Sequence, residues 1–273
     1  MNEAKSLLDA GNLSGSIESV LAAVKKNPTD ISARTFLFEL SIFAGDWARA
    51  EKQLDVIGHQ DANTMIGSLI YRQCLEGERK RQRFFSEGLK PEFLADPPDY
   101  IYGLLTANNR IREGGLAEAR EILDKVEEER PAISCRVNGE QKQDLRDYND
   151  LTMCILEAFV NDSYLWIPLE QIVKIEFEPR KSLRDLFWRQ AKIETLNGTN
   201  GEFLVPVLYA DSWKSTSDQV RLGRFTDWRD MGSELYAGEG QKLFFIDGEA
   251  KGILEFDRLE FDAEELAETR ASS

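Results

Sequence analysis

The first half of the chain contains an internal repeat with a period of 34 residues. Three copies of a short motif each begin with a glycine, at Gly11, Gly45 and Gly114. The first two glycines are 34 residues apart, and the third follows after two periods plus one inserted residue. A period of this length predicts stacked helix pairs, because one pair can bury its apolar face only against a neighbouring pair.

The residues after each glycine fit the second helix of such a pair. A small residue lies five positions on, where it lets two helices approach closely, and apolar residues follow on the same face. These positions are Ser16, Val20 and Ala23, then Ala50, Leu54 and Ile57, then Ala119, Leu123 and Val126. Pro28 and Pro131 end the first and third copies, because proline does not continue a helix. The pattern resembles the tetratricopeptide (TPR) repeat, a helix–turn–helix unit of this length.

The stretch between the second and third copies departs from this pattern. Arg79-Lys80-Arg81 and Phe84 occupy the places of the turn glycine and the small residue. We interpret this repeat as degenerate, with one longer helix in place of a pair. The basic run from Arg79 to Arg83 is predicted to be a solvated helix face, and a docking patch for an acidic partner or a phosphate is the alternative.

After Pro131 the apolar period changes from 3.6 to two, which is typical of β-strands. Residues 172–178 alternate in this way, and Asn197-Gly198 and Asp247-Gly248 each separate two strand-like runs. These dipeptides predict two β-hairpins. The charged tail after Asp262 is expected to fray or to add a short helix.

The sequence therefore predicts an α+β protein with two domains. We expect a TPR-like α-solenoid over residues 1–131, a linker over 132–144, and a small, mostly antiparallel β-rich domain over 145–273. The stacked helix pairs are expected to form a concave surface of the kind that binds a peptide or a helix.

Composition narrows the choice of partners and compartment. Lys and Arg total 34 against 49 Asp and Glu, which gives a formal charge of −15 and disfavours nucleic acid and anionic membranes as partners. No apolar run reaches the roughly 18 residues that span a bilayer. Three cysteines, far apart in the sequence, suit a reducing compartment, so we expect a cytoplasmic protein.

The sequence offers little for catalysis. His59 is the only histidine, and its neighbours do not complete a Ser-His-Asp or Cys-His site. Gly238-Glu239-Gly240 lacks the third glycine and the following helix of a dinucleotide-binding loop, and we interpret it as a β-turn or bulge. We predict a non-enzymatic protein with no catalytic residue, cofactor or metal.

An enzyme or small-ligand-binding β domain, recruited by the repeats, is the alternative. A deep pocket lined together by Asp147, Arg184, Asp185 and Arg224 would favour it. An assembly chaperone that holds several partners is a third option.

Five motifs in the second half occur in a characteristic order. They are Leu145–Asp150, Tyr164–Pro168, Leu183–Trp188, Arg221–Trp228 and Gly238–Gln241. With the TPR-like half, they resemble the ImpE family, also called TagJ or SciE, across nearly the whole chain. Two positions depart mildly from the family pattern. The family favours acidic residues in the stretch that contains Asn149, and it often has arginine at the position of Lys242.

The resemblance implies an accessory protein of bacterial type VI secretion without enzymatic activity. Some family members bind the N-terminal helix of TssB, the small subunit of the contractile sheath, and this helix is therefore the expected partner. The first helix of each TPR pair lines the concave side, which predicts a binding groove. Its predicted residues are Thr35, Glu39, Ile42, Ile66, Leu69, Gln73, Leu104, Asn108 and Ile111. Ile42, Leu69 and Leu104 are the expected anchors of the sheath helix.

Overall fold

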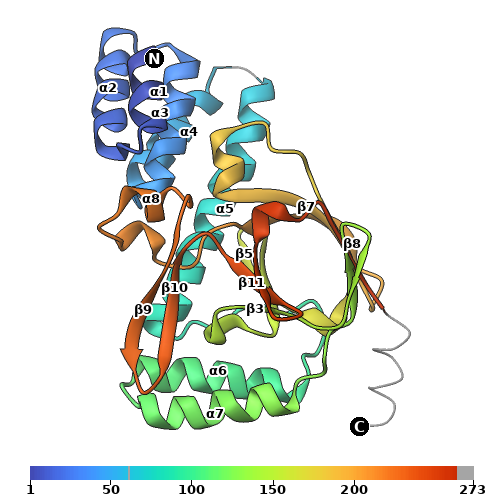
Figure 1. Cartoon of the computed structure of the whole chain (residues 1–273). Helices are drawn as coiled ribbons and strands as arrows, with labels where there is room; N and C mark the ends of the chain where they lie inside the picture. Colours follow the sequence, from blue (N-terminus) through green and yellow to red (C-terminus); the bar gives the residue numbers. More distant parts are fainter. Residues whose placement is uncertain (61, 263–273) are drawn as a thin grey trace.

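The computed structural model describes residues 1–60 and 62–262 and has a helical first half followed by antiparallel sheets (Figure 1). The predicted α+β class is confirmed. Apart from one isolated bridge between Glu92 and Leu165, every described strand begins after residue 134. The predicted behaviour of the tail after Asp262 lies outside the described residues.

The first four helices form two antiparallel pairs at one end of the molecule (Figure 1). They are α1 (Asn2–Asp9), α2 (Leu13–Lys26), α3 (Ile31–Phe43) and α4 (Trp47–Gly58). The turn glycines Gly11 and Gly45 have φ values of +80° and +68°, a backbone region in which glycine has no steric cost. Ser16 and Ala50, the predicted close-approach residues, are fully buried.

One long helix replaces the third pair, as the degenerate repeat predicts. Helix α5 (Ala62–Glu87) runs from the first two pairs along the β half, and α6 (Asp99–Arg112) and α7 (Leu116–Glu129) pair at its far end (Figure 1). The helix pairs therefore do not form a continuous stack. The turn glycine of this last pair, Gly114, has φ +84°.

The main sheet has eight strands in the order β2-β1-β13-β6-β7-β8-β4-β5, and all neighbours are antiparallel. The strands are β1 (Cys135–Val137), β2 (Glu140–Lys142), β4 (Ile155–Val160), β5 (Ser163–Pro168), β6 (Ile172–Phe177), β7 (Trp188–Thr195), β8 (Asn200–Pro206) and β13 (Arg258–Phe261). Strands β1 and β2 lie within the predicted linker, residues 132–144. This stretch is part of the sheet because the last strand, β13, pairs with β1.

Two smaller sheets complete the β half. One has the order β12-β11-β3, and the other is a two-stranded hairpin that reaches toward α6 (Figure 1). Their strands are β3 (Leu145–Asp147), β11 (Leu243–Ile246), β12 (Glu249–Gly252), β9 (Thr226–Gly232) and β10 (Leu235–Gly240). The prediction that Gly238-Glu239-Gly240 forms a turn or bulge is wrong, because these residues end strand β10. Gly238 is required there since a side chain would overlap the ring of Tyr209.

Both predicted hairpins are confirmed. Asn197-Gly198 connects β7 to β8, and Asp247-Gly248 connects β11 to β12. Asp247 and Gly248 both have positive φ, 48° and 88°, which is the geometry that a two-residue hairpin turn requires.

A segment of the β half, residues 212–224, contacts the turns of the first helix pairs. It contains a short helix, α8 (Asp218–Arg221). Oδ2 of Asp218 accepts a hydrogen bond from the backbone N–H of Leu13 at 2.9 Å, at the start of α2. Arg224 donates to the carbonyls of Leu8 and Asp9, at the end of α1. These bonds satisfy helix-terminal groups that lack partners within their own helices.

Candidate functional site

The predicted groove residues fall into three environments. Glu39, Ile42, Leu104 and Asn108 are buried, Thr35, Gln73 and Ile111 are half-buried, and Ile66 and Leu69 are exposed. Two of the three expected anchors, Ile42 and Leu104, have no exposed surface. The expectation that they line an open groove is therefore wrong.

The β half covers the side of the helices on which the groove was expected. The ring of Phe187 packs edge-on against Phe43 of α3, with 5.1 Å between centroids. Arg184 binds Glu39 of α3 at 2.8 Å and donates to the hydroxyl of Tyr71 on α5. Burial raises the pKa of Glu39, although the Arg184 charge opposes that rise.

The β half also covers α6, as it covers α3. The side-chain amide of Asn108 donates to the carbonyl of Leu151 at 3.0 Å, and Leu151 belongs to the 3-10 helix that follows β3. A TPR groove open to solvent is therefore absent over α3 and α6.

The first turns of α5 carry an exposed apolar surface, which we call the α5 ridge. Its members lie at positions i, i+1, i+4 and i+5 and therefore share one face of the helix. They are Met65, Ile66, Leu69 and Ile70, with exposures of 55%, 60%, 53% and 48%. Half of the eight large apolar side chains exposed in the described chain lie in this ridge. A contiguous exposed apolar patch of this kind is typical of a protein-binding surface.

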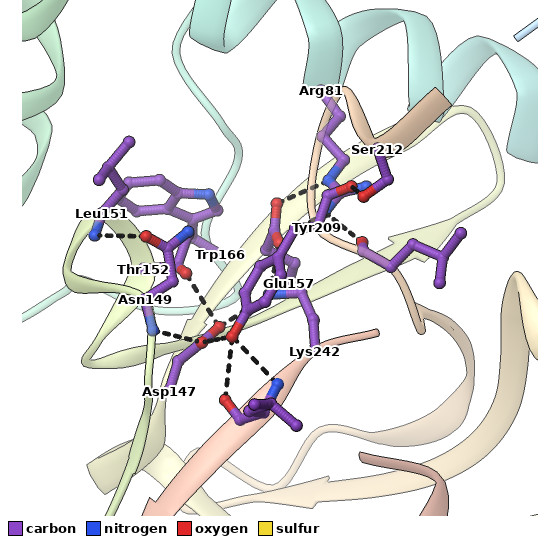
Figure 2. Close-up of polar contacts among 12 residues, drawn as sticks. Arg81, Asp147, Asn149, Leu151, Thr152, Glu157, Trp166, Tyr209, Ser212 and Lys242 are labelled. Atoms are coloured by element: carbon purple, nitrogen blue, oxygen red, sulfur yellow. Dashed lines mark hydrogen bonds and ion pairs between the residues drawn. The ribbon is translucent and has the colours of Figure 1, made fainter. Parts of the chain in front are cut away.

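A network of buried charges joins α5 to the β half (Figure 2). Arg81 of α5 donates to both carboxylate oxygens of Glu157 on β4, at 2.7 and 2.9 Å, and lies 3.3 Å from Glu78. Lys242 binds Glu157 and Asp147, both at 2.8 Å. All five side chains are at most 3% exposed.

Neutral donors complete the network. Tyr164 donates to Glu157 at 2.7 Å, and Tyr209 and Thr152 each donate to Asp147 at 2.9 Å. The backbone N–H of Asn149 also donates to Asp147, at 3.0 Å, so each carboxylate oxygen of Glu157 and Asp147 has two donors. Buried charges of this kind are stable only with such full pairing.

Burial and ion pairing act in opposite directions on the pKa values of the network. Burial alone would raise the pKa of Glu157, but Arg81 and Lys242 outweigh it and hold the pKa well below its usual range. Burial raises the pKa of Glu78, and the charge of Arg81 opposes that rise. Asp147 and Glu157 raise the pKa of Lys242 against the effect of burial, so that the lysine stays charged.

The prediction that Arg79 to Arg83 form a solvated face is wrong for Arg81. The other three cations of the run pair with carboxylates at the surface, Arg79 with Glu51, Lys80 with Asp162 and Arg83 with Glu87. Arg81 points instead into the protein, where the main sheet supplies Glu157.

A pocket of about 300 Å³ lies next to this network. Its walls come from the end of α5, from α6, from the 3-10 helix at 150–152 and from the β9–β10 hairpin. Glu157 and Tyr209 form part of its lining, so the network and the pocket share a wall.

The four residues of the alternative site are not together. Asp147 belongs to the buried network, and Arg184 bonds to α3 and α5. Asp185 accepts from the backbone N–H groups of residues 181 and 182, and Arg224 bonds to the end of α1. Each has a structural partner, as expected for arginines and carboxylates that stabilise loops.

The histidine lies outside the buried network and the pocket lining. His59 is exposed at the end of α4, with Nδ1 2.5 Å from the carbonyl of Asp55. Within residues 1–60 and 62–262, no three His, Cys, Asp or Glu side chains are grouped to hold a metal ion. In the same residues, no helix combines the length and apolar character needed to cross a bilayer.

Comparison with known proteins identifies relatives over nearly the full length. The family profile described as "ImpE protein" matches residues 139–260. The chain is 31% identical to the type VI secretion system accessory component TagJ of Pseudomonas aeruginosa over 259 residues, which is 95% of this chain and 91% of the relative. The crystal structure of protein VPA1032 from Vibrio parahaemolyticus superposes with a TM-score of 0.87 at 26% identity, covering 94% of this chain and 97% of that one.

Proposed function

The chain belongs to the ImpE family, and from this membership we propose that it is a type VI secretion accessory protein that binds a helix of the small sheath subunit through the α5 ridge. The accessory role follows from its similarity to TagJ. The sheath helix and the ridge are the specific parts of the proposal.

The ridge supports the proposal because four large apolar side chains exposed to water do not stabilise α5, whereas a partner that covers them would gain binding free energy. Complete burial of a fully exposed side chain of this kind contributes about 1.5–3 kcal/mol, and about half of that is available here because each of the four is already about half buried. An amphipathic partner helix would remove them from water by packing its own apolar stripe against α5. Leu69 keeps its place as an expected anchor, with Ile66 beside it, whereas Ile42 and Leu104 are unsuited to that role.

Binding of this kind requires no cofactor, metal or covalent step, so we propose a non-catalytic adaptor. We also propose a cytoplasmic location. The three cysteines, Cys74, Cys135 and Cys154, are all buried and free of disulfides, which suits a reducing compartment.

The test is a titration of a synthetic N-terminal helix of the cognate sheath small subunit against the wild-type protein and two ridge variants. We expect Leu69→Ala and Ile66→Ala each to weaken binding by about 2 kcal/mol, roughly thirtyfold. Tyr102→Ala is the matched control, because Tyr102 is 52% exposed on α6, outside the ridge. Circular dichroism checks folding. Unchanged affinity in both folded ridge variants would rule out the α5 ridge as the binding site.

A further inference from the structure

The pocket beside the buried network has two buried amides on its wall. Asn108 and Asn149 are each only 6% exposed, and both line the pocket. They lie on either side of the same residue: Asn108 donates to the carbonyl of Leu151, and Asn149 accepts from its N–H at 3.3 Å. The two amides are therefore close together.

These hydrogen bonds within the protein determine which polar atom of each side-chain amide, Oδ1 or Nδ2, can bind a ligand. Nδ2 of Asn108 is used twice, for the carbonyls of Leu104 and Leu151, which leaves Oδ1 as an acceptor. Oδ1 of Asn149 is used by Leu151, which leaves Nδ2 as a donor. Neither free atom has a hydrogen-bond partner within the described residues. The wall thus offers one acceptor and one donor, the complement of an amide group.

The pocket also has cationic side chains. Arg112, Lys214 and Arg229 line it, and the last two have side chains that are 54% and 56% exposed, which places them toward the mouth. Lys214 binds Asp211 at 2.7 Å, and Arg229 binds Glu239 at 3.2 Å.

Arg112 differs from these two cations. It donates to the side chain of Asn109 and forms no ion pair with a carboxylate of the described chain. Glu157 on the wall is already neutralised by Arg81 and Lys242. The guanidinium of Arg112 lies against Gly88, just after the end of α5. Of the three cations in the pocket lining, Arg112 is therefore the one without a carboxylate partner among the described residues, and it can bind a ligand carboxylate.

Apolar side chains supply the rest of the lining. Phe85, Ile111, Leu151 and Met231 are among them. The volume of about 300 Å³ is at the small end for ligand pockets, so it suits a group of amino-acid size.

We propose that this pocket binds an N-acyl amino acid unit with a free carboxylate. The ligand carboxylate binds Arg112, its amide bonds to Asn108 and Asn149, and an apolar side chain packs against Met231 and its neighbours. Such a unit is the last residue of a peptide or a free acylated amino acid. Leu69 and Phe85 are 16 residues apart on α5, about 24 Å along the helix, so this pocket is separate from the α5 ridge.

Methionine methyl NMR can locate the ligand. The chain has four methionines, of which Met231 lies in the pocket and Met65 in the ridge. In a titration of the full chain with N-acetyl-L-leucine, we expect the Met231 signal to shift and saturate while the Met65 signal stays unchanged. N-acetyl-L-leucinamide, which lacks the carboxylate, is expected to bind at least tenfold more weakly.

The matched variants are Arg112→Gln and Arg110→Gln on the same helix. Arg110 pairs at the surface with Glu113 and Glu118. Arg112→Gln should weaken N-acetyl-L-leucine at least tenfold, and Arg110→Gln should leave it within twofold. Unchanged Met65 and Met153 signals check folding.

Equal binding of the acid and the amide, or no Met231 shift into the millimolar range, would overturn the proposal, and neither result depends on a variant. An acetylated pentapeptide that ends in leucine distinguishes the two sources. If it binds as tightly as N-acetyl-L-leucine, the unit is a peptide C-terminus; if it is excluded while N-acetyl-L-leucine binds, the unit is a free acylated amino acid.

Discussion

Gly45 lies directly against the indole ring of Trp213, and a Cβ atom at Gly45 would overlap that ring. The glycine makes the turn between α3 and α4, whereas the tryptophan belongs to the segment 212–224 of the β half. Gly11, at the same place in the first repeat, contacts Gln219 in the same way. Gly11 and Gly45 therefore serve both the turns and the contact between the two halves, whereas Gly114 serves its turn alone.

Gly45→Ala should lower the free energy of unfolding by about 2–5 kcal/mol. Positive φ costs a non-glycine residue about 1–2 kcal/mol, and the overlap with Trp213 adds about 1–3 kcal/mol. Gly114→Ala is the matched control, because Gly114 has φ +84° but open space around it. Urea denaturation should show a loss of only about 1–2 kcal/mol there. Equal losses in the two variants would contradict a role for the Trp213 contact.

Ile42→Ala and Leu104→Ala should each reduce stability by about 2–5 kcal/mol, because both side chains are fully buried. Leu69→Ala should change stability by no more than about 0.5 kcal/mol, since half of its surface is already in water. Thermal and urea unfolding measure both effects. A neutral Ile42→Ala variant would mean that α3 is not packed as described.

Arg81→Ser should destabilise the protein by about 3–5 kcal/mol, because it leaves the charges of Glu78 and Glu157 buried without their guanidinium partner. Arg83→Ser, two residues away, removes a surface pair with Glu87 and should cost less than about 1 kcal/mol. Urea unfolding of the two variants at neutral pH makes the comparison. Similar stabilities would show that residue 81 is solvated after all.

The contribution of Glu157 should depend on pH. Its pKa in the folded protein lies below the ordinary value of 4.5, so its ionisation stabilises the fold above pH 4.5, and that stability is lost as pH falls toward the folded pKa. Glu157→Gln should therefore be less stable than wild type by about 3 kcal/mol or more at pH 7, and the difference should narrow below pH 4.5. Urea unfolding at pH 7 and pH 3.5, with Glu87→Gln as the exposed control, tests this. A difference that is constant with pH would show that Glu157 is not ionised in the fold.

The repeat period and the turn dipeptides were sufficient to predict the helix pairs, the long α5 and both hairpins. These features are local, because a glycine with positive φ or an Asp-Gly turn determines its own neighbourhood. The pairing of β13 with β1 could not be predicted, since residues 135–137 and 258–261 are far apart in sequence and each is short. For that reason residues 132–144 were expected to be a linker.

The groove prediction failed because it assumed that the repeats stand alone. The register assigned Ile42 and Leu104 to an open inner side, but both side chains are fully buried, and the β half contacts α3 and α6 beside them. A signal for the buried network was available in the sequence: Glu157 is the one charged residue in the apolar run 153–160, and a charge in such a run is usually buried with a partner. The identity of that partner, Arg81, depends on tertiary contacts 76 residues apart.

The position of β13 has a consequence for synthesis. A nascent chain that ends before Arg258 contains β1 and β2, but these strands lack the neighbour that joins them to β6. The early helices can pair as they emerge from the ribosome, whereas completion of the main sheet must wait for residues 258–261. Until then the edge of β6 remains unpaired, and an open edge is a site for association with other chains. Emergence of residues 258–261 is therefore the step at which the open edge of β6 is covered.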